Sequence, residues 1–230
     1  MVGVKLTVSV IVPTYKEAES IQPFVERLYR CLSNLDFELI IVDDSTNNDT
    51  EIAARTICEK LELDYRIVRR GERGKGSAIR EGLKLAKGEQ IVVIDADLEY
   101  PPEEIKPMLE KLKQGDAVTS IRMRKNTFMR RILSMFFRML VLFLFQIPFE
   151  TQSGLKVLNK KARNIKFDTK GWSWDAEFLY KCRKNNLKIL LHELQYTPRK
   201  MGKSKIHPLK TSLEMFIELF KVRLKTLWLT

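Results

Sequence analysis

The feature that most constrains the fold is a regular alternation of two hydrophobic patterns in the first half of the chain. Short apolar runs rich in β-branched residues occur at residues 7–12, 39–42, 65–68, 91–94 and 117–121. Patterns with helical spacing lie between them, at about residues 20–33, 48–62, 75–87 and 102–114. Repeated strand–helix–strand units predict an α/β fold with a mostly parallel, doubly wound sheet and helices on both faces.

Polar clusters follow three of the predicted strands, where open α/β sheets bind their ligands. They lie at residues 13–17, 43–45 and 95–99. Asp95 and Asp97 stand two positions apart directly after an apolar run, so both carboxylates can converge on one hard cation such as Mg²⁺ or Mn²⁺. A metal held there would bind a diphosphate and neutralise the charge on a departing nucleotide diphosphate. Glu99 can add a third oxygen, or act through water.

Other polar segments leave a ligand role and a structural role open. Asp44 is interpreted as a ligand for a base or ribose, and Asp49 as a helix cap. The Gly- and base-rich segment 70–76 resembles a phosphate cradle, but it lacks Walker or dinucleotide-binding spacing, which favours simple loop geometry. Asp175 opens a helical pattern and is either a catalytic base or a partner of the helix dipole. The basic segment 199–205 has no acid nearby and is interpreted as closing over an anionic substrate.

Charge is distributed unevenly along the chain. Residues 1–116 carry 17 Lys/Arg against 22 Asp/Glu, whereas residues 117–230 carry 24 against 7. This excess predicts that the second half faces a polyanion, with phosphates, anionic lipid or nucleic acid as candidates. A surface that is basic only for solubility is the alternative. The three cysteines are scattered without CxxC spacing, which indicates a reducing compartment, and the N-terminal residues show no signal-peptide pattern.

Two amphipathic segments in the basic half favour a membrane surface. Residues 132–149 are largely apolar, with polar positions recurring every four residues at Arg130, Ser134, Arg138 and Gln146. The longest unbroken apolar run is 139–145, too short for a spanning helix, which needs about 20 residues. Residues 209–229 repeat the pattern, with a polar stripe at Lys210, Glu214, Glu218, Lys221 and Lys225. Two interfacial helices are expected, although two ordinary helices packed on the sheet would show the same pattern.

Several motifs in fixed order resemble the A-type inverting glycosyltransferases, and more narrowly the dolichol-phosphate mannose synthase group and its glucosyl relatives. They are residues 10–17, 41–45 and 95–102, followed by Ser153-Gly154-Leu155 and Arg199-x-x-Gly202-x-Ser204-Lys205. The resemblance spans about residues 8–206 and implies a GT-A fold. We expect a catalytic domain at residues 1–208, including an interfacial helix at about 128–146, and a C-terminal amphipathic helix at 209–230.

The resemblance also implies roles for individual residues. The implied nucleoside site consists of Pro13, Tyr15, Glu17, Val42 and Asp44. The implied metal and diphosphate site consists of Asp95, Ala96, Asp97 and Glu99. Phosphate contacts are implied for Arg122, Arg199 and Lys205. Of these, Asp97 and Arg122 are expected to act in catalysis together with Asp175.

The expected activity is transfer of mannose or glucose, with inversion, from GDP-mannose or UDP-glucose to a dolichyl or other polyprenyl phosphate, with Mg²⁺ or Mn²⁺ as cofactor. The chain departs from the family pattern at Lys16 and at Glu99, and the third carboxylate at Glu99 leaves the metal open. Residues 174–177 look closer to the glucosyl relatives. We expect a peripheral protein on the cytoplasmic face of a membrane, without a transmembrane helix. The alternatives are a GT-A enzyme with a sugar or protein acceptor, and a non-catalytic anion- or nucleic-acid-binding protein. The last is disfavoured because no groove-reading helix or aromatic platform is recognisable.

Overall fold

A computed structural model describes residues 8–123, 128–149, 151–195 and 208–227 of the 230-residue chain. Within these ranges seven strands form one sheet in the order β3-β2-β1-β4-β6-β5-β7. The strands are β1 (Val8–Thr14), β2 (Phe37–Asp43), β3 (Tyr65–Arg69), β4 (Gln90–Ile94), β5 (Ala117–Met123), β6 (Leu155–Leu158) and β7 (Ile189–Gln195). Only β6 is antiparallel to its neighbours, β4 and β5. The predicted mostly parallel α/β sheet is therefore confirmed, with β6 and β7 as additions to the five expected strands.

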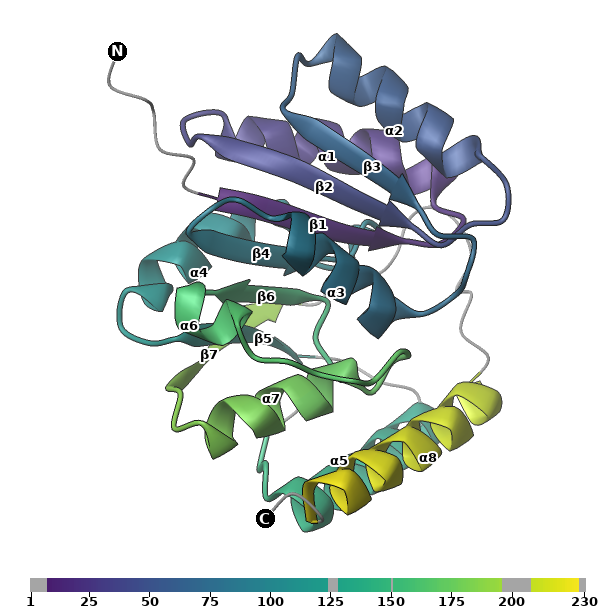
Figure 1. Ribbon diagram of the computed structural model, residues 1–230, viewed down its shortest axis with the longest axis vertical. Coiled ribbons are helices and arrows are strands. Elements are labelled where there is room, and N and C mark those ends of the chain that lie inside the picture. The colour runs from purple at the N-terminus through teal and green to yellow at the C-terminus, as the bar shows by residue number, and fades with distance from the viewer. Residues whose placement is uncertain (1–7, 124–127, 150, 196–207, 228–230) are drawn as a thin grey trace.

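Helices cover both faces of the sheet (Figure 1). They are α1 (Ala18–Leu32), α2 (Asp49–Lys60), α3 (Lys75–Leu85), α4 (Ile105–Leu112) after the short 3₁₀ turn η1 (Pro102–Glu104), α5 (Phe128–Phe145), α6 (Lys160–Arg163), α7 (Trp174–Lys184) and α8 (Pro208–Leu227). One core contains side chains of α1, α2 and α4, and the other contains side chains of α3, α5, α7 and α8. The sheet lies between these two layers.

The central strands show why the chain folds this way. Every residue of β2 is buried, and successive side chains of β1 and β2 enter opposite cores. Val10 and Val12 pack with α1, whereas Ile11 between them packs with α3. A strand buried on both faces needs an unbroken apolar run, because its side chains alternate between two helix layers.

The register brings the predicted polar clusters to one edge of the sheet. Thr14 at the end of β1 pairs with Asp43 at the end of β2, and β4 runs parallel to β1 on its other side. Asp95 directly follows β4, and its amide donates to the carbonyl of Gly154 (2.9 Å) just before β6. Carboxylates far apart in the sequence therefore lie at the carboxyl ends of β2 and β4, the two strands on either side of β1.

The two predicted amphipathic segments form α5 and α8, which lie side by side at the end of the molecule away from α2 and β3 (Figure 1). Of the large hydrophobic side chains exposed in the described residues, all except Ile52 belong to these two helices. They are Met135, Phe136, Met139, Leu142, Phe143, Leu213, Phe216, Ile217, Phe220 and Leu224. No helix in the described ranges is both long and apolar enough to cross a bilayer.

Candidate active site

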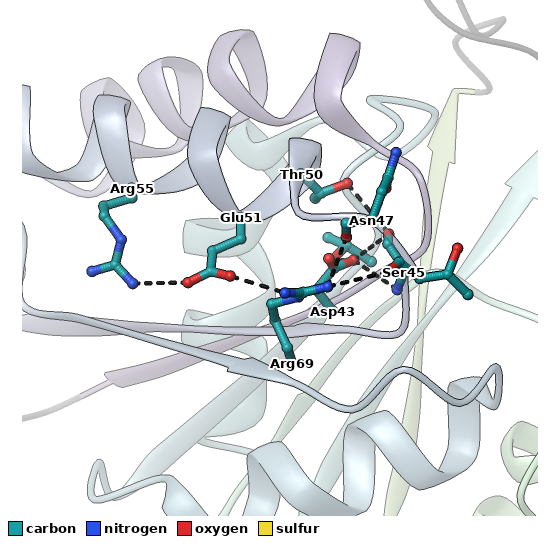
Figure 2. Close-up of polar contacts among 9 residues, drawn as sticks. Asp43, Ser45, Asn47, Thr50, Glu51, Arg55 and Arg69 are labelled. Carbon is teal, nitrogen blue, oxygen red and sulfur yellow. Dashed lines mark hydrogen bonds and ion pairs between the residues drawn. The ribbon is translucent and has the colours of Figure 1, made fainter.

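Asp43 fastens the ends of β1 and β2 together. Its buried Oδ1 accepts hydrogen bonds from the hydroxyl of Thr14 (2.9 Å), the hydroxyl of Ser45 (2.7 Å) and the amide of Ser45 (3.3 Å). Figure 2 shows this cluster beneath the start of α2. The Ser45 hydroxyl in turn accepts from the amide of Lys16 (2.7 Å). Oδ1 of Asp43 therefore connects the ends of β1 and β2, whereas its buried Oδ2 has no hydrogen-bond partner among the described residues.

The start of α2 corrects one expectation. The residue at the N-cap is Asn48, not Asp49, and its side chain makes no capping hydrogen bond. Asp49 is the first helical residue and accepts instead from the side chain of Asn47. The hydroxyl of Thr50 accepts from the amide of Glu17 (3.0 Å), so α2 is tied to the loop after β1 rather than capped locally.

Asp44 has a different environment from its neighbour. Its Oδ2 accepts from the amide of Gly74 (2.7 Å), while its Oδ1 lies 3.5 Å from Nε of Arg70 without a hydrogen bond. Burial raises the pKa of Asp44 to about 6, although the Gly74 amide and the Arg70 charge oppose that rise. A buried carboxylate with one oxygen left unsatisfied is a good acceptor for a ligand N–H or O–H.

An aromatic residue, Tyr15, directly follows β1. The ring of Tyr15 lies 4.9 Å from the guanidinium carbon of Arg73 and 5.5 Å from Nζ of Lys16. Pro13 is partly buried at the end of β1, whereas the side chain of Val42 is fully buried in the core. Tyr15, with its flanking cations, therefore offers a surface for a base, whereas Val42 can meet a ligand only through its backbone.

Lys75, the first residue of α3, reaches the carboxylate of Asp95. Its Nζ lies 2.7 Å from both Oδ1 and Oδ2 of Asp95, and 5.3 Å from the ring centre of Trp172. Burial lowers the pKa of Lys75, but the charges of Asp95, Asp175 and Asp97 outweigh it, so the pKa lies above its usual value. The ammonium group stays charged and holds Asp95 in place at the end of β4.

Asp97 and Glu99 lie on the tight turn that follows. The amide of Glu99 donates to Oδ1 of Asp97 (3.1 Å), and Leu98 between them has a left-handed backbone with φ of +60°. The ligand set predicted from Asp95, Asp97 and Glu99 remains a prediction. Over the described ranges no three His, Cys, Asp or Glu side chains are grouped as for a metal ion. Two carboxylates at this strand end still suit a hard divalent cation, whose remaining ligands would come from a diphosphate and water.

The segment before β6 packs closely against Asp95. Gly154 precedes β6, and a Cβ there would collide with Oδ2 of Asp95 and with the ring of Tyr100. A glycine is therefore required where the chain passes Asp95, since any side chain would displace the carboxylate.

Asp175, in the first turn of α7, forms a buried ion pair with Lys156. The Nζ of Lys156 donates to Oδ1 of Asp175 and to the carbonyl of Ser153 (2.8 Å), and it lies 5.0 Å from the ring centre of Trp174. Both side chains are almost fully buried. Burial raises the pKa of Asp175 and lowers that of Lys156, and the ion pair opposes both changes. Asp175 is thus held by a partner rather than exposed as a dipole partner on the helix surface.

The turn at residues 168–173 occupies the N-terminus of α3. The amides of Gly76 and Ser77 donate to the carbonyls of Gly171 and Lys170, both at 3.1 Å. A Cβ at Gly76 would collide with this turn, so the glycine serves close packing. The segment 70–76 is therefore chiefly loop geometry, as favoured from the sequence, because its first helical N–H groups are already bonded inside the protein.

Three predicted phosphate ligands cannot be placed. Arg122 is the next-to-last residue of β5, at the same edge of the sheet as Asp95, and its side chain lies outside the described residues. Arg199 and Lys205 also lie outside the described ranges. Their roles stay predictions.

Sequence reasoning missed Lys75 and Lys156 as parts of the site. Lys75 lies in the Gly- and base-rich segment 70–76, but the spacing of that segment does not show that Lys75 meets Asp95. Lys156 carried a clearer signal: it is a single lysine within the otherwise apolar run of β6. A charge on a buried strand needs a partner, and here that partner is Asp175.

Comparison with protein families decides what kind of site this is. The family model described as glycosyl transferase family 2 matches residues 9–172, which include the strand-end carboxylates and most of the sheet. The chain belongs to glycosyl transferase family 2. The resemblance drawn from the sequence motifs is confirmed.

The names of similar curated proteins describe transfer of sugars to lipid phosphates. A dolichyl-phosphate β-glucosyltransferase of Dictyostelium discoideum is 25% identical over 245 residues, covering 95% of this chain and 74% of that protein. A dolichol-phosphate mannosyltransferase of Pyrococcus furiosus is 37% identical over 114 residues, covering 49% of this chain but only 32% of that protein. An undecaprenyl-phosphate 4-deoxy-4-formamido-L-arabinose transferase of Pectobacterium atrosepticum is 31% identical, over 58% of this chain and 42% of that protein.

Solved structures share the fold. Glucosyl-3-phosphoglycerate synthase of Mycobacterium tuberculosis superposes with a TM-score of 0.73 at 21% identity, covering 94% of this chain and 80% of that one. The same enzyme has been solved with Mn²⁺, UDP-glucose and phosphoglyceric acid. At this identity the likeness supports the GT-A fold, as predicted, and nothing narrower.

Proposed function

We propose that this family 2 glycosyltransferase moves a hexose from a nucleotide diphosphate to a polyprenyl phosphate, with inversion at the anomeric carbon. The observation that carries the proposal is the arrangement at the carboxyl end of β4. Asp95, bound by Lys75, lies on the same sheet edge as the half-satisfied carboxylate of Asp44. One end of this edge suits a nucleoside and the other a diphosphate, which is the shape of a nucleotide-sugar site.

The proposed transfer would not need a strong general base from the protein. An oxygen of the acceptor phosphate attacks the anomeric carbon as the bond from that carbon to the donor diphosphate breaks. A phosphate monoester has its second pKa near 6, so the attacking oxygen is already largely ionised near neutral pH. Asp175, held by Lys156, would orient the acceptor or the sugar rather than remove a proton.

Electrostatic stabilisation of the departing diphosphate would be the main contribution. A divalent cation, Mg²⁺ or Mn²⁺, would be held by Asp95 and Asp97 and would neutralise charge on the leaving group. Lys75 is already at this position and can bind the same phosphates. Arg122, Arg199 and Lys205 are proposed to bind phosphates of the donor or the acceptor, because each is a cation that the family pattern places beside them.

The lipid acceptor is supported by the surface of α5 and α8. Among the described side chains, the two helices expose ten large apolar ones, in a half of the chain that carries 24 Lys/Arg against 7 Asp/Glu. An apolar surface of this kind within a basic region suits the interface of a membrane with anionic lipids. We propose a peripheral protein that docks by this face, which brings a lipid-linked phosphate to the active site.

A donor panel tests the first half of the proposal. GDP-mannose, UDP-glucose, GDP and UDP are each added with Mn²⁺ or Mg²⁺, and the melting temperature is recorded. A true donor raises it, because a ligand that binds only the native state stabilises by RT ln(1 + [L]/Kd). The panel identifies base and metal together. If no nucleotide raises the melting temperature with either metal, the donor assignment is wrong.

A further inference from the structure

The face that α8 turns toward the protein contains one residue of the predicted polar stripe. The predicted polar stripe of α8 included Glu218, but Glu218 is only partly exposed and lies on the inward face. Its companions on that face are Thr211, Met215, Leu219 and Val222, all buried. Other apolar residues of α8 are exposed, which is the orientation that an interfacial helix requires: Leu213, Phe216, Ile217, Phe220 and Leu224. A carboxylate turned inward among buried side chains needs a specific contact.

That contact is with the turn before α7. Oε1 of Glu218 accepts from the amide of Gly171 (3.0 Å), and Oε2 accepts from the amide of Ser173 (3.3 Å). The hydroxyl of Ser173 donates to the carbonyl of Met215 on α8 (3.1 Å). A Cβ at Gly171 would lie 2.7 Å from Oε1 of Glu218, so a side chain there would push this carboxylate away from the turn. One side chain of α8 thus holds both backbone amides of the turn.

The same turn reaches the donor side of the site. Its carbonyl at Gly171 accepts from Gly76 in the first turn of α3, next to Lys75. Trp172 lies between these two contacts and has its ring 5.3 Å from Nζ of Lys75. Lys75 in turn holds Asp95. Packed, hydrogen-bonded contacts therefore run without a gap from α8 to the carboxylate at the end of β4.

We propose that Glu218 is a positioning residue that couples the seating of α8 on a lipid surface to nucleotide binding at Asp95 and Lys75. By fixing the turn at residues 170–173, it sets the position of the first turn of α3 and the start of α7. A lipid surface acts on the opposite face of α8, through side chains such as Leu213 and Phe220. The coupling rests on the proposed function, in which α8 docks on a membrane.

The test compares nucleotide affinity in solution and on vesicles. UDP and GDP, each with Mn²⁺, are titrated into the wild-type chain and into Glu218→Ala, with and without vesicles of phosphatidylcholine and phosphatidylserine. Vesicles tighten nucleotide binding by the wild type at least about fivefold, the lower end of couplings between distinct sites. Glu218→Ala binds the vesicles like the wild type, but its nucleotide affinity does not respond to them.

The control is Glu214→Ala, one turn earlier on α8. Glu214 is exposed, so this variant makes the same change in charge and helix composition without touching the turn. It is expected to respond to vesicles like the wild type. If Glu218→Ala does not fold, Glu218→Gln replaces it: it keeps the shape but offers one acceptor oxygen where two amides donate, and it is expected to lose most of the response.

Each outcome decides between distinct failures. Retained tightening in both Glu218 variants overturns the coupling, as does a wild type that binds vesicles and nucleotide independently. A wild type that binds nucleotide but no vesicle overturns the coupling together with membrane docking. A wild type that binds no nucleotide refutes the proposed donor site itself.

Discussion

At the carboxyl ends of β1, β2 and β4, charged side chains are drawn into the protein and paired, whereas along α5 and α8 apolar side chains are left exposed. The first region holds Asp44, Asp95 and Lys75 within hydrogen-bond or ion-pair distance of internal partners. The second exposes residues such as Phe143, at 83%. The two regions reverse the usual distribution of polar and apolar groups, and they are the two surfaces proposed to bind the donor and a lipid membrane.

The deepest charges should matter most for stability. Replacing Lys156 with Met leaves Asp175 buried without a partner, and removing one member of a buried ion pair costs about 3–5 kcal/mol. Urea denaturation of Lys156→Met should show a loss of this size in the free energy of unfolding. The double variant Lys156→Met/Asp175→Asn should regain much of it. A loss below about 1 kcal/mol in the single variant would mean that the pair is open to water.

At the strand end, Asp97 should matter for turnover rather than for folding. Asp97→Asn keeps the shape of the side chain but removes the charge proposed to bind metal. A fall in kcat of about a hundredfold or more is expected, the size seen when one electrostatic group of an active site is lost. The melting temperature without ligands should be unchanged. Asp64→Asn, which changes an exposed carboxylate at the opposite end of the sheet, should keep full activity. Metal-dependent turnover near the wild-type rate in Asp97→Asn would refute the metal role.

On the other side of the comparison, one exposed phenylalanine should control lipid binding. Phe143→Glu removes an apolar side chain worth about 1.5–3 kcal/mol when buried in lipid and adds a charge that anionic lipids repel. Vesicle sedimentation should show affinity reduced about tenfold or more, with folding stability unchanged. Ile52→Glu is the matched control, because Ile52 is equally apolar and 55% exposed but lies on α2. Equal effects of the two changes would assign no special role to the α5–α8 face.

A smaller effect distinguishes Asp44 from fully satisfied carboxylates. Its raised pKa means that the native protein keeps a proton that the unfolded chain has lost, so the free energy of unfolding falls as pH rises from about 4 to about 6. Asp44→Asn has no titrating carboxyl group at this position. Its free energy of unfolding relative to that of the wild type should therefore rise by about 1–2 kcal/mol between pH 4 and pH 6. Denaturation at pH 4 and at pH 7 measures the difference. A wild type and variant with parallel pH dependence would place Asp44 in contact with water.

The fold was accessible from the sequence because its signals are local. The alternation of apolar runs and helical patterns predicted five strands in their right places, since strands buried on both faces are largely apolar. β6 was not predicted, because it is only four residues long and contains Lys156. β7 was not predicted, because His192 and Glu193 interrupt its apolar residues.

The site was only partly accessible, because partners from distant segments meet in space. Asp44 and Asp95 could be singled out as residues at strand ends. Their contacts with the amide of Gly74 and the ammonium group of Lys75 could not be predicted, because the spacing does not show which donor meets which carboxylate. The inward contact of Glu218 was missed for a related reason: an amphipathic pattern shows that a helix has two faces, and only packing shows which polar side chain is turned inward.

The central claim is tested most directly by looking for the lipid product. The chain is incubated with Mn²⁺ or Mg²⁺, with UDP-glucose or GDP-mannose, and with polyprenyl phosphate in anionic vesicles, and the lipid fraction is examined by mass spectrometry. The account predicts a polyprenyl phosphate carrying one hexose, formed with one of the two donors and absent with Asp97→Asn. Transfer only to a water-soluble sugar or protein acceptor, or no consumption of either donor, would contradict it.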